Sequence, residues 1–210
     1  MTQEDKIRKE LSDYLEFNSD EMFQSNFNII HVFGGAIRDI LCGDKINDVD
    51  ILCGSRAAKF LKTILESNGY VYIESLQPKD LSSIYSDLRV ICEPHSYVKG
   101  SKVVQIIRPA ENFNFDISAY RKSFSDLISN VDMSCCGVSY DGSKLNEDYP
   151  NAILHCQSKV FSVNKNAKMY SEKRFLFRKY KLEDRGWKEV ENTSWVNRDL
   201  KMERIFNDEV

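Results

Sequence analysis

The sequence predicts an α/β (α+β) protein built on a mixed sheet. Short apolar segments typical of strands alternate with amphipathic helical segments along the chain, which is the pattern of a sheet covered by helices. With 210 residues, 42% of them hydrophobic, the chain is large enough for one domain with a small appendage. We therefore expect one main sheet with helices packed on it.

In the first half of the chain, hydrophobic spacing and glycines predict each element. A helix is expected over residues 4–17, where apolar residues recur at helical spacing: Ile7, Leu11, Tyr14 and Leu15. An expected strand at 28–33 runs into two glycines, and a helix should follow them to about Cys42. The segment 49–53 is the second expected strand.

In the second half, polar and turn residues separate further apolar segments. A helix is expected over 55–70, with Ser55 as its cap and Gly69 as its end. Loops are expected at 75–88 and 93–101, which contain Pro, Ser, His and Gly. Four segments have the apolar or alternating pattern of strands: 70–74, 88–92, 102–107 and 113–120.

Charge is unevenly distributed. The net charge is −3, so the whole chain is no polycation, yet residues 159–185 hold nine Lys/Arg and only three Asp/Glu. We expect a basic helix at 171–185 that ends at Gly186. Its cations form either a solvated helix face or a surface that contacts the phosphates of a nucleotide or a nucleic acid.

The cysteines and the first residues bear on the compartment. The six cysteines show no CxxC or zinc spacing, and the adjacent pair Cys135-Cys136 is a poor disulfide candidate. The segment MTQEDKIRKEL has no apolar signal region, and no run approaches the ~20 apolar residues of a membrane helix. We therefore expect buried thiols, a reducing, cytoplasmic compartment and no membrane partner.

Two adjacent glycines follow the expected strand at 28–33. An apolar strand that runs into Gly34-Gly35 and then into a helix brings backbone N–H groups close to a ligand, and a helix N-terminus attracts anions. This corner suits a phosphate, although many strand-glycine-helix corners are only tight turns.

Two aspartates lie on the expected strand at 49–53 and its entry. Residues i and i+2 of a strand point to the same face, so Asp48 and Asp50 present two carboxylates side by side. Like charges between apolar neighbours are costly unless a cation neutralises them, and Mg²⁺ binds carboxylates together with substrate phosphates. The alternative is an Asn-Asp turn at Asp48, with Asp50 only at a strand start.

The stretch 33–52, FGGAIRDILCGDKINDVDIL, resembles the motif GGxVRDxLLGxxxxDxD. That motif belongs to the head domain of class II tRNA nucleotidyltransferases and bacterial poly(A) polymerases, in the polymerase β superfamily. The resemblance implies a small mixed sheet that carries the aspartates, with helices packed on it. Arg38 would either neutralise phosphate charge or pair with Asp39 to hold the corner, and both roles stay open.

Two later segments extend the resemblance. FDISAYR (115–121) resembles the family strand vEvatfR, which implies Asp116 as a third metal ligand; the alternative is a surface aspartate. VDMSCCGVSYDG (131–142) resembles RDFTINALAYD, which implies a nucleotide-binding role for Asp132. The arginines and the asparagine of that motif are replaced here: Asn130, Val131 and Cys136.

The basic segment resembles the family's base-reading helix. SEKRFLFRKYKLEDRGW (171–187) is similar to the motif EDxxRxxR, which implies that Arg174 and Arg178 contact the nucleotide. The Glu-Asp pair of that motif is not in place. We expect a head domain over 1–150 and, over 151–210, a basic and partly helical extension that resembles a truncated neck.

The combined prediction is an Mg²⁺-dependent nucleotidyltransferase. It would transfer NMP from an NTP, such as ATP or CTP, to an acceptor hydroxyl, expected at an RNA or tRNA 3′ end. Two Mg²⁺ ions would be held by three catalytic carboxylates: Asp48, Asp50 and Asp116. The expected nucleotide-binding residues are Gly34, Gly35, Arg38, Asp39, Asp132, Arg174 and Arg178. Transfer to a protein or small molecule by a minimal head domain, and a non-catalytic nucleotide- or RNA-binding module, remain open alternatives.

Overall fold

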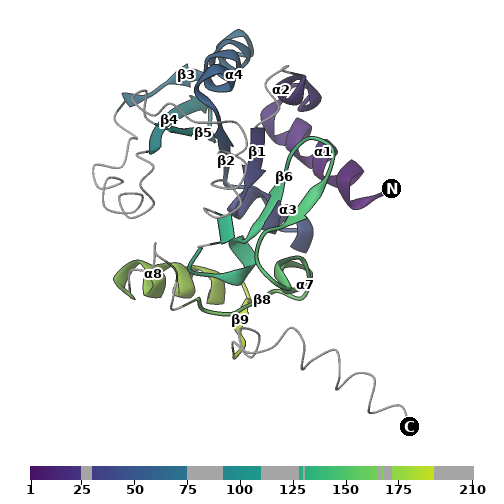
Figure 1. Cartoon of the computed structure of the whole chain (residues 1–210), viewed down its shortest axis with the longest axis vertical. Coiled ribbons are helices and arrows are strands. Elements are labelled where there is room, and N and C mark those ends of the chain that lie inside the picture. Colours follow the sequence, from purple (N-terminus) through teal and green to yellow (C-terminus); the bar gives the residue numbers. More distant parts are fainter. Residues whose placement is uncertain are drawn as a thin grey trace.

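The structure, a computed structural model, describes residues 1–24, 30–74, 92–109, 128–129, 131–164, 167 and 172–191 (Figure 1). Its helices are α1 (Gln3–Leu15), α2 (Asp20–Phe23), α3 (Gly35–Cys42), α4 (Ser55–Ser67), η3 (Ser134–Cys136, a 3-10 helix), α7 (Ala152–Gln157) and α8 (Glu172–Glu183). Its strands are β1 (Ile30–Phe33), β2 (Asp48–Cys53), β3 (Val71–Tyr72), β4 (Cys92–Lys99), β5 (Lys102–Pro109), β6 (Val138–Tyr140), β7 (Leu145–Glu147), β8 (Val160–Phe161) and β9 (Lys188–Glu189).

Within the described residues, seven strands form one mixed sheet in the order β3-β4-β5-β2-β1-β6-β7. Strands β2 and β5 run parallel, and the other neighbouring pairs are antiparallel. Strands β8 and β9 form a separate parallel pair. The predicted fold class, a mixed sheet with helices packed on it, is confirmed.

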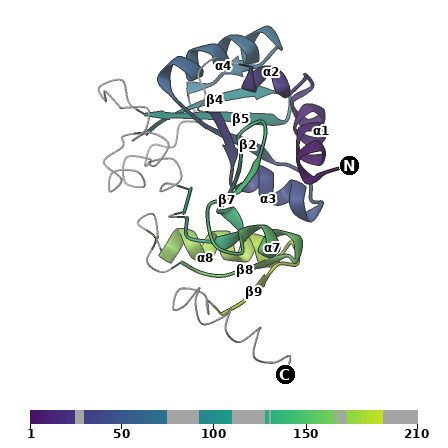
Figure 2. The ribbon, with the colours of Figure 1, turned by 45° about the vertical axis from the view of Figure 1, so that its right-hand side comes forward.

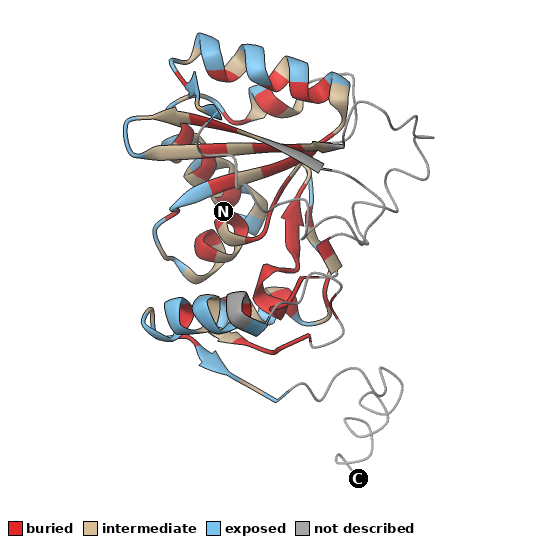
Figure 3. Ribbon diagram, turned by 90° about the vertical axis from the view of Figure 1, so that its left-hand side faces the viewer, coloured by how far each residue is buried: buried red, intermediate tan, exposed pale blue. Residues whose placement is uncertain are grey.

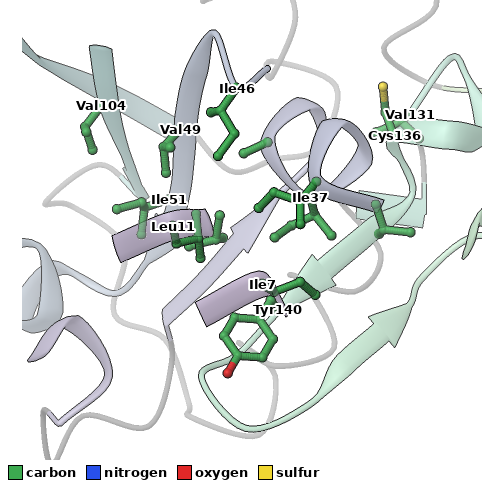
Figure 4. Packing of buried hydrophobic residues seen from close by; sticks show 14 of the residues in the cluster. Ile7, Leu11, Ile37, Ile46, Val49, Ile51, Val104, Val131, Cys136 and Tyr140 are labelled. Atoms are coloured by element: carbon green, nitrogen blue, oxygen red, sulfur yellow. The ribbon is translucent and has the colours of Figure 1, made fainter. Parts of the chain in front are cut away.

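The register of β2 sorts its side chains onto two faces of the sheet. Asp48 and Asp50 point to one face, while Val49 and Ile51 point to the other, because successive strand residues alternate. Val49 pairs in register with Val104 of β5, and both are fully buried in the core (Figure 4). The helices α1 and α3 supply buried residues to the same core: Ile7, Leu11, Leu15, Ile37 and Ile40. Each such aliphatic side chain stabilises the fold by about 1.5–3 kcal/mol.

Helix α4 is amphipathic and covers the β4–β5 part of the sheet. Its buried residues recur at helical spacing: Ala57, Ala58, Leu61 and Leu65. In Figure 3 this helix lies at the top, with its buried side toward the strands and its exposed side outward. The aspartate face of β2 is therefore turned away from the helical layer.

The C-terminal elements form a layer at the other end of the molecule from α4 (Figure 2). Phe175 and Leu182 of α8 and Trp187 beyond it are buried and belong to the same hydrophobic core as the sheet. Gly186 has φ +83°, which suits glycine and lets the chain leave α8, as expected. The division into a head over 1–150 and an extension over 151–210 stays a prediction.

Three expectations for local structure need correction. The prediction of a loop at 93–101 is wrong, because β4 extends to Lys99 and forms a hairpin with β5 that turns at Gly100. Cross-strand pairing along β4 outweighs the turn-like composition of that segment. Ser55 is the first residue of α4 and does not cap it; the cap is Gly54, without a side-chain hydrogen bond. The strand expected at 70–74 is shorter in the structure, where β3 covers only Val71–Tyr72.

Several expected segments lie outside the described residues. These are 28–29, most of the loop and strand expected at 75–92, and the strand expected at 113–120. In the part of the chain that the structure describes, no helix combines the length and the apolar character that a membrane crossing needs.

Gly137 connects η3 to β6 at a point of very close packing. A Cβ at this residue would lie 2.1 Å from Tyr149 Cβ and 3.2 Å from Tyr149 Cα, and Tyr149 is fully buried. We expect Gly137→Ala to lower the free energy of unfolding by about 1–3 kcal/mol, because overpacking forces the backbone to shift. Chemical denaturation would measure the loss.

A control glycine separates overpacking from backbone strain. Gly43 has φ +77°, and apart from its chain neighbours no atom of the described part of the chain lies within 4 Å of its Cβ position. Gly43→Ala should therefore cost only the left-handed backbone conformation, about 1–2 kcal/mol. A Gly137→Ala variant as stable as the wild-type protein would contradict the packing described for η3 and β6.

Candidate active site

The corner between β1 and α3 depends on Gly34. This residue has φ 67° and ψ −125°, a conformation that only glycine adopts readily, and it is the N-cap of α3. Its N–H donates to the carbonyl of Val138 (3.1 Å), and its carbonyl accepts from the N–H of Arg38 (3.0 Å). Apart from its chain neighbours, no atom of the described residues lies within 4 Å of the Cβ position of Gly34. The backbone of the corner therefore borders open space beside the first turn of α3, whose N–H groups lack helical acceptors.

The two aspartates of β2 lie next to this corner. Asp50 pairs in register with Phe33, the last residue of β1 before the glycines. Asp48 is exposed, and its Oδ1 lies 3.9 Å from the Cβ position of Gly35. The predicted phosphate corner and the predicted carboxylate pair thus occupy one place in the structure.

The carboxylate of Asp50 has an unfavourable environment. Its Oδ1 is buried, and no group that the structure describes forms a hydrogen bond with it. Burial, and then the nearby charge of Asp48, raise the pKa of Asp50 to about 7, against a smaller lowering by Arg178. An oxygen-only site with an unsatisfied carboxylate fits a divalent cation such as Mg²⁺. The donors present at Asp48 and Asp50 therefore suit the metal that the resemblance implies.

Arg178 of α8 reaches this region from the C-terminal layer. Its Nη1 lies 2.6 Å from Oδ1 of the buried Asp132, and its Nη2 donates to Sγ of Cys136 (3.3 Å). The side chain is 40% exposed, and its charge acts on the pKa of Asp50. Arg178 is therefore held by Asp132 and Cys136, and its side chain remains partly exposed.

Arg38 is enclosed by protein groups. Its Nε and Nη2 lie 2.7 Å from Oδ1 of Asp39, and its Nη1 donates to Sγ of Cys136 (3.5 Å). Its guanidinium also lies over the ring of Trp187, 5.7 Å from the centroid. Of the two roles left open by the sequence, the geometry is that of pairing with Asp39 to hold the corner.

Asp39 belongs to an ion-pair network. It is 2% exposed, and its Oδ1 also lies 2.9 Å from Nη2 of Arg185. Arg185 pairs in addition with Asp44 (3.0 Å), which pairs with Lys159 (2.7 Å). These contacts tie the C-terminal end of α3 to the chain after α7 and α8.

Asp39, Cys42 and Asp44 could in principle hold a metal ion, since their ligand atoms cluster within 4.8 Å. The carboxylates are already neutralised by arginine and lysine, and burial raises the pKa of the Cys42 thiol. A cation here would have to displace existing ion pairs. We therefore assign this cluster to structural ion pairing.

Cys136 is a site residue that sequence reasoning did not propose. It is buried, with its sulfur between the guanidiniums of Arg38 and Arg178. The neighbouring Cys135 thiol, and then both guanidiniums, hold the pKa of Cys136 well below its usual range despite burial. Cys135 and Cys136 form no disulfide. The sequence signal was the position itself, where the family motif has asparagine.

Two predicted residues have no described side-chain geometry. Asp116 lies outside the described residues, and for Arg174 only the backbone in α8 is described. Their assignment to metal and nucleotide stays a prediction. Among the described residues, the fold brings together side chains from three distant segments: Arg38, Asp48, Asp50, Asp132 and Arg178.

Comparison with known proteins gives a family and a fold. Residues 5–176 match the model of a family described as Gabija anti-defense 2 family protein. No curated protein is similar enough in sequence to add to this match.

Solved CCA-adding enzymes have a similar fold. A CCA-adding enzyme with CTP is 16% identical with a TM-score of 0.60, over 95% of this chain and 44% of that chain. A Thermotoga maritima CCA-adding enzyme complexed with tRNA is 17% identical with a TM-score of 0.58, over 88% and 40%. A complex with ATP is 16% identical with a TM-score of 0.58, over 88% and 40%. The chain spans about two fifths of the length of these enzymes, and the predicted resemblance is confirmed as one of fold.

The raised pKa of Asp50 predicts how stability depends on pH in the metal-free protein. The folded state keeps a proton up to about pH 7, whereas the unfolded state releases it near the ordinary value of 3.8. The contribution of Asp50 to stability is therefore present at low pH, decreases as pH rises from about 4 to 7, and then stays constant. Asp50→Asn should raise the melting temperature in EDTA more at pH 8 than at pH 4.5, by roughly 2–8 °C.

The same proton opposes metal binding. Affinity for Mg²⁺ or Mn²⁺ should increase up to about tenfold per pH unit below pH 7 and level off above it. Calorimetry at several pH values would measure this. Equal effects of Asp50→Asn on the melting temperature at both pH values would contradict the described environment of Asp50.

Proposed function

The chain belongs to the Gabija anti-defense 2 family, and we propose that it is a divalent-metal-dependent nucleotidyltransferase that transfers NMP from an NTP to an acceptor hydroxyl. The observation that carries the proposal is the buried Oδ1 of Asp50, with which no described group forms a hydrogen bond, beside Asp48 and the Gly34-Gly35 corner. An ionised carboxylate in this environment is stabilised by a cation, and a glycine corner at a helix N-terminus accepts phosphate. Both groups are parts of phosphoryl-transfer sites.

The corner would hold the triphosphate. The first-turn N–H groups of α3 and the positive end of its dipole would accept the β- and γ-phosphates. Arg38 would position the corner, because its guanidinium is committed to Asp39 and Cys136. Gly35 leaves room for phosphate where another residue would place a side chain.

The carboxylates would hold the metal. Asp48 and Asp50 would bind Mg²⁺, with two ions and a third ligand at Asp116 as our proposal from the resemblance. Bound Mg²⁺ supplies charge neutralisation at the phosphates and a lowered pKa of the attacking hydroxyl. Asp50, with its pKa near 7, would bind metal as a carboxylate at and above neutral pH.

Arg178 would close the side of the site nearest Asp50. Asp132 and Cys136 orient its guanidinium, whose positive charge would act on the negative charge of the bound nucleotide. This role agrees with the predicted place of Asp132 and Arg178 in nucleotide binding. This chain has Cys136 at the position of the motif's asparagine. The side chain at this position would therefore hold the two arginines in place.

For the acceptor, we propose an RNA 3′ end first, because the neighbours of similar fold are described with CTP, ATP and tRNA. A second candidate, a protein or small-molecule hydroxyl, is favoured by the pairing of the basic segment 159–185. Four of its cations already form ion pairs with carboxylates of the chain: Lys159, Arg178, Lys179 and Arg185. Those cations are less available for phosphates. The family description, anti-defense, would suit either acceptor.

Incubation with radiolabelled NTPs and Mg²⁺ or Mn²⁺ would test the proposal. Total RNA and a protein extract are offered as separate acceptors. Label on RNA supports the first acceptor, and label on protein supports the second. No transfer to either, by a folded protein that also fails to bind NTP, would overturn the proposal.

Asp48→Asn and Asp50→Asn are expected to reduce nucleotide incorporation to background while the fold survives. Each removes a metal ligand on the sheet face opposite to the buried Val49 and Ile51, and neither removes a core side chain. Asp13→Asn is the matched control, because Asp13 is exposed on α1. Incorporation near the wild-type rate in both site variants would show that the carboxylates do not bind the catalytic metal.

Gly35→Val is expected to weaken NTP affinity by about tenfold, because branched methyl groups would occupy the approach of the phosphates. The Cβ itself meets only ordinary contacts, 3.6 Å to Arg38 Nη2 and 3.9 Å to Asp48 Oδ1, so the fold should tolerate the change. Calorimetry would measure the affinity, and thermal denaturation of Gly35→Val would check folding. An unchanged affinity would mean that the corner is only a turn.

A further inference from the structure

A second site lies between α4 and the β3–β4–β5 end of the sheet. A cavity of about 290 Å³ is present there. Most of its lining residues are basic or aromatic: Lys59, Lys62, Arg108, His95, Tyr72 and Tyr97. Figures 1 and 2 both show this part of the sheet at the end of the molecule opposite α8.

The cavity is separated from the candidate active site by the sheet itself. His95 pairs in register with Ile106 of β5, which pairs with Ile51 of β2. Side chains in register share a face, so the cavity lies on the face of Ile51. Asp48 and Asp50 point to the opposite face, and a ligand of one site cannot contact the other.

The positive charge of the cavity comes from two elements. Lys59 and Lys62 are exposed and lie three residues apart, so they share a face of α4. Arg108 lies at the end of β5, and its Nε donates to Nε2 of His95 (3.0 Å), which orients the guanidinium. Among the described carboxylates, only Glu66 pairs with Lys62, at 3.7 Å, and none pairs with Lys59. An anion between α4 and β5 would therefore meet three cations.

The aromatic part of the cavity is already ordered. Tyr72 lies on the edge strand β3 and is 38% exposed. Its ring packs against His95 (5.8 Å between centroids, 37° between planes) and against the buried Tyr97 (5.6 Å, 57°). A ring held in this way can stack a planar ligand without losing much rotamer freedom.

We propose that this cavity binds a nucleoside phosphate, with the base on Tyr72 and the phosphate between Lys59, Lys62 and Arg108. Aromatic stacking next to a cationic groove is how proteins bind nucleotides and single strands without reading sequence. The ligand is either a free nucleotide or one nucleotide of a single strand, which share this chemistry. The site is independent of the proposed transfer reaction.

The test removes the candidate active site first. In the Asp48→Asn/Asp50→Asn variant with EDTA, metal-dependent binding at the catalytic face is absent. Calorimetry with AMP, and fluorescence anisotropy with a labelled oligoadenylate of eight nucleotides, then report on the remaining site. Because no transfer is measured, failure here and failure of the proposed function are distinguishable.

Substitution of the cations should weaken binding. Lys59→Gln/Lys62→Gln should raise the Kd of AMP about tenfold or more through the loss of two phosphate contacts. Arg56→Gln/Lys9→Gln removes the same charge from exposed positions outside the cavity and should change Kd less than about twofold. Equal effects of the two double variants would overturn the site, since they would indicate only a response to net charge.

Substitution of the ring tests the nucleoside part. Tyr72→Ala should raise the Kd of AMP about fivefold or more and leave pyrophosphate binding unchanged, whereas Tyr72→Phe should stay within about twofold. Circular dichroism would check that each variant is folded.

The two probes identify the source of the ligand. Oligoadenylate that binds more tightly than AMP, and competes with it, assigns a strand. AMP binding without competition by the oligomer assigns a free nucleotide. No binding of either probe, or binding insensitive to Tyr72→Ala, would overturn the proposal.

Discussion

The buried carboxylate of Asp39 is the interaction on which the arrangement of the candidate site depends. Its Oδ1 lies within 2.9 Å of guanidinium nitrogens of both Arg38 and Arg185, and only 2% of the residue is exposed. Removal of one partner from a buried ion pair typically costs about 3–5 kcal/mol, because a charge is left unpaired. Through Arg38 the carboxylate holds the glycine corner, and through Arg185 it holds the chain that follows α8. The C-terminal layer is therefore joined to the sheet at the same residue that supports the corner.

Asp50 shows the opposite use of a carboxylate. Asp39 is satisfied by two cations, whereas Asp50 has a buried Oδ1 without a described hydrogen-bond donor and a pKa raised to about 7. The fold stabilises one carboxylate and leaves the other destabilised at the mouth of an open corner. Such a difference between neighbouring carboxylates is typical of a ligand-binding position, where strain in the free protein is relieved on binding.

The sequence could predict the part of the site that is local. Gly34, Gly35, Asp48 and Asp50 fall within one short stretch, so strand alternation and glycine geometry are enough to place them. The same reasoning failed for β4, because cross-strand pairing with β5 decides that segment and its own composition is that of a loop.

The partners of Cys136 were beyond such reasoning. Arg38 and Arg178 contact its sulfur from 98 and 42 residues away, and no periodic pattern encodes a contact of that range. The sequence did indicate that Arg178 lies on a helix, but the face that it presents depends on the packing of Phe175 and Leu182 into the core. Local rules therefore placed Asp48 and Asp50 beside the glycine corner and offered the Arg38–Asp39 pair as one alternative, but they missed the contacts of both arginines with Cys136.

The ion pairs around Cys136 favour the thiolate form of its side chain. Among the described residues, Cys136 links two groups of ion pairs that together contain four cations and three carboxylates: Arg38, Arg178, Arg185, Lys159, Asp39, Asp44 and Asp132. A thiolate at Cys136 makes the cluster neutral, which agrees with the lowered pKa of that thiol. A neutral asparagine, the residue of the family motif, would leave one positive charge in excess beside Asp50. We infer that the cysteine offsets part of the positive charge of Arg178 at the carboxylates, which acts in the same direction as the burial that raises the pKa of Asp50.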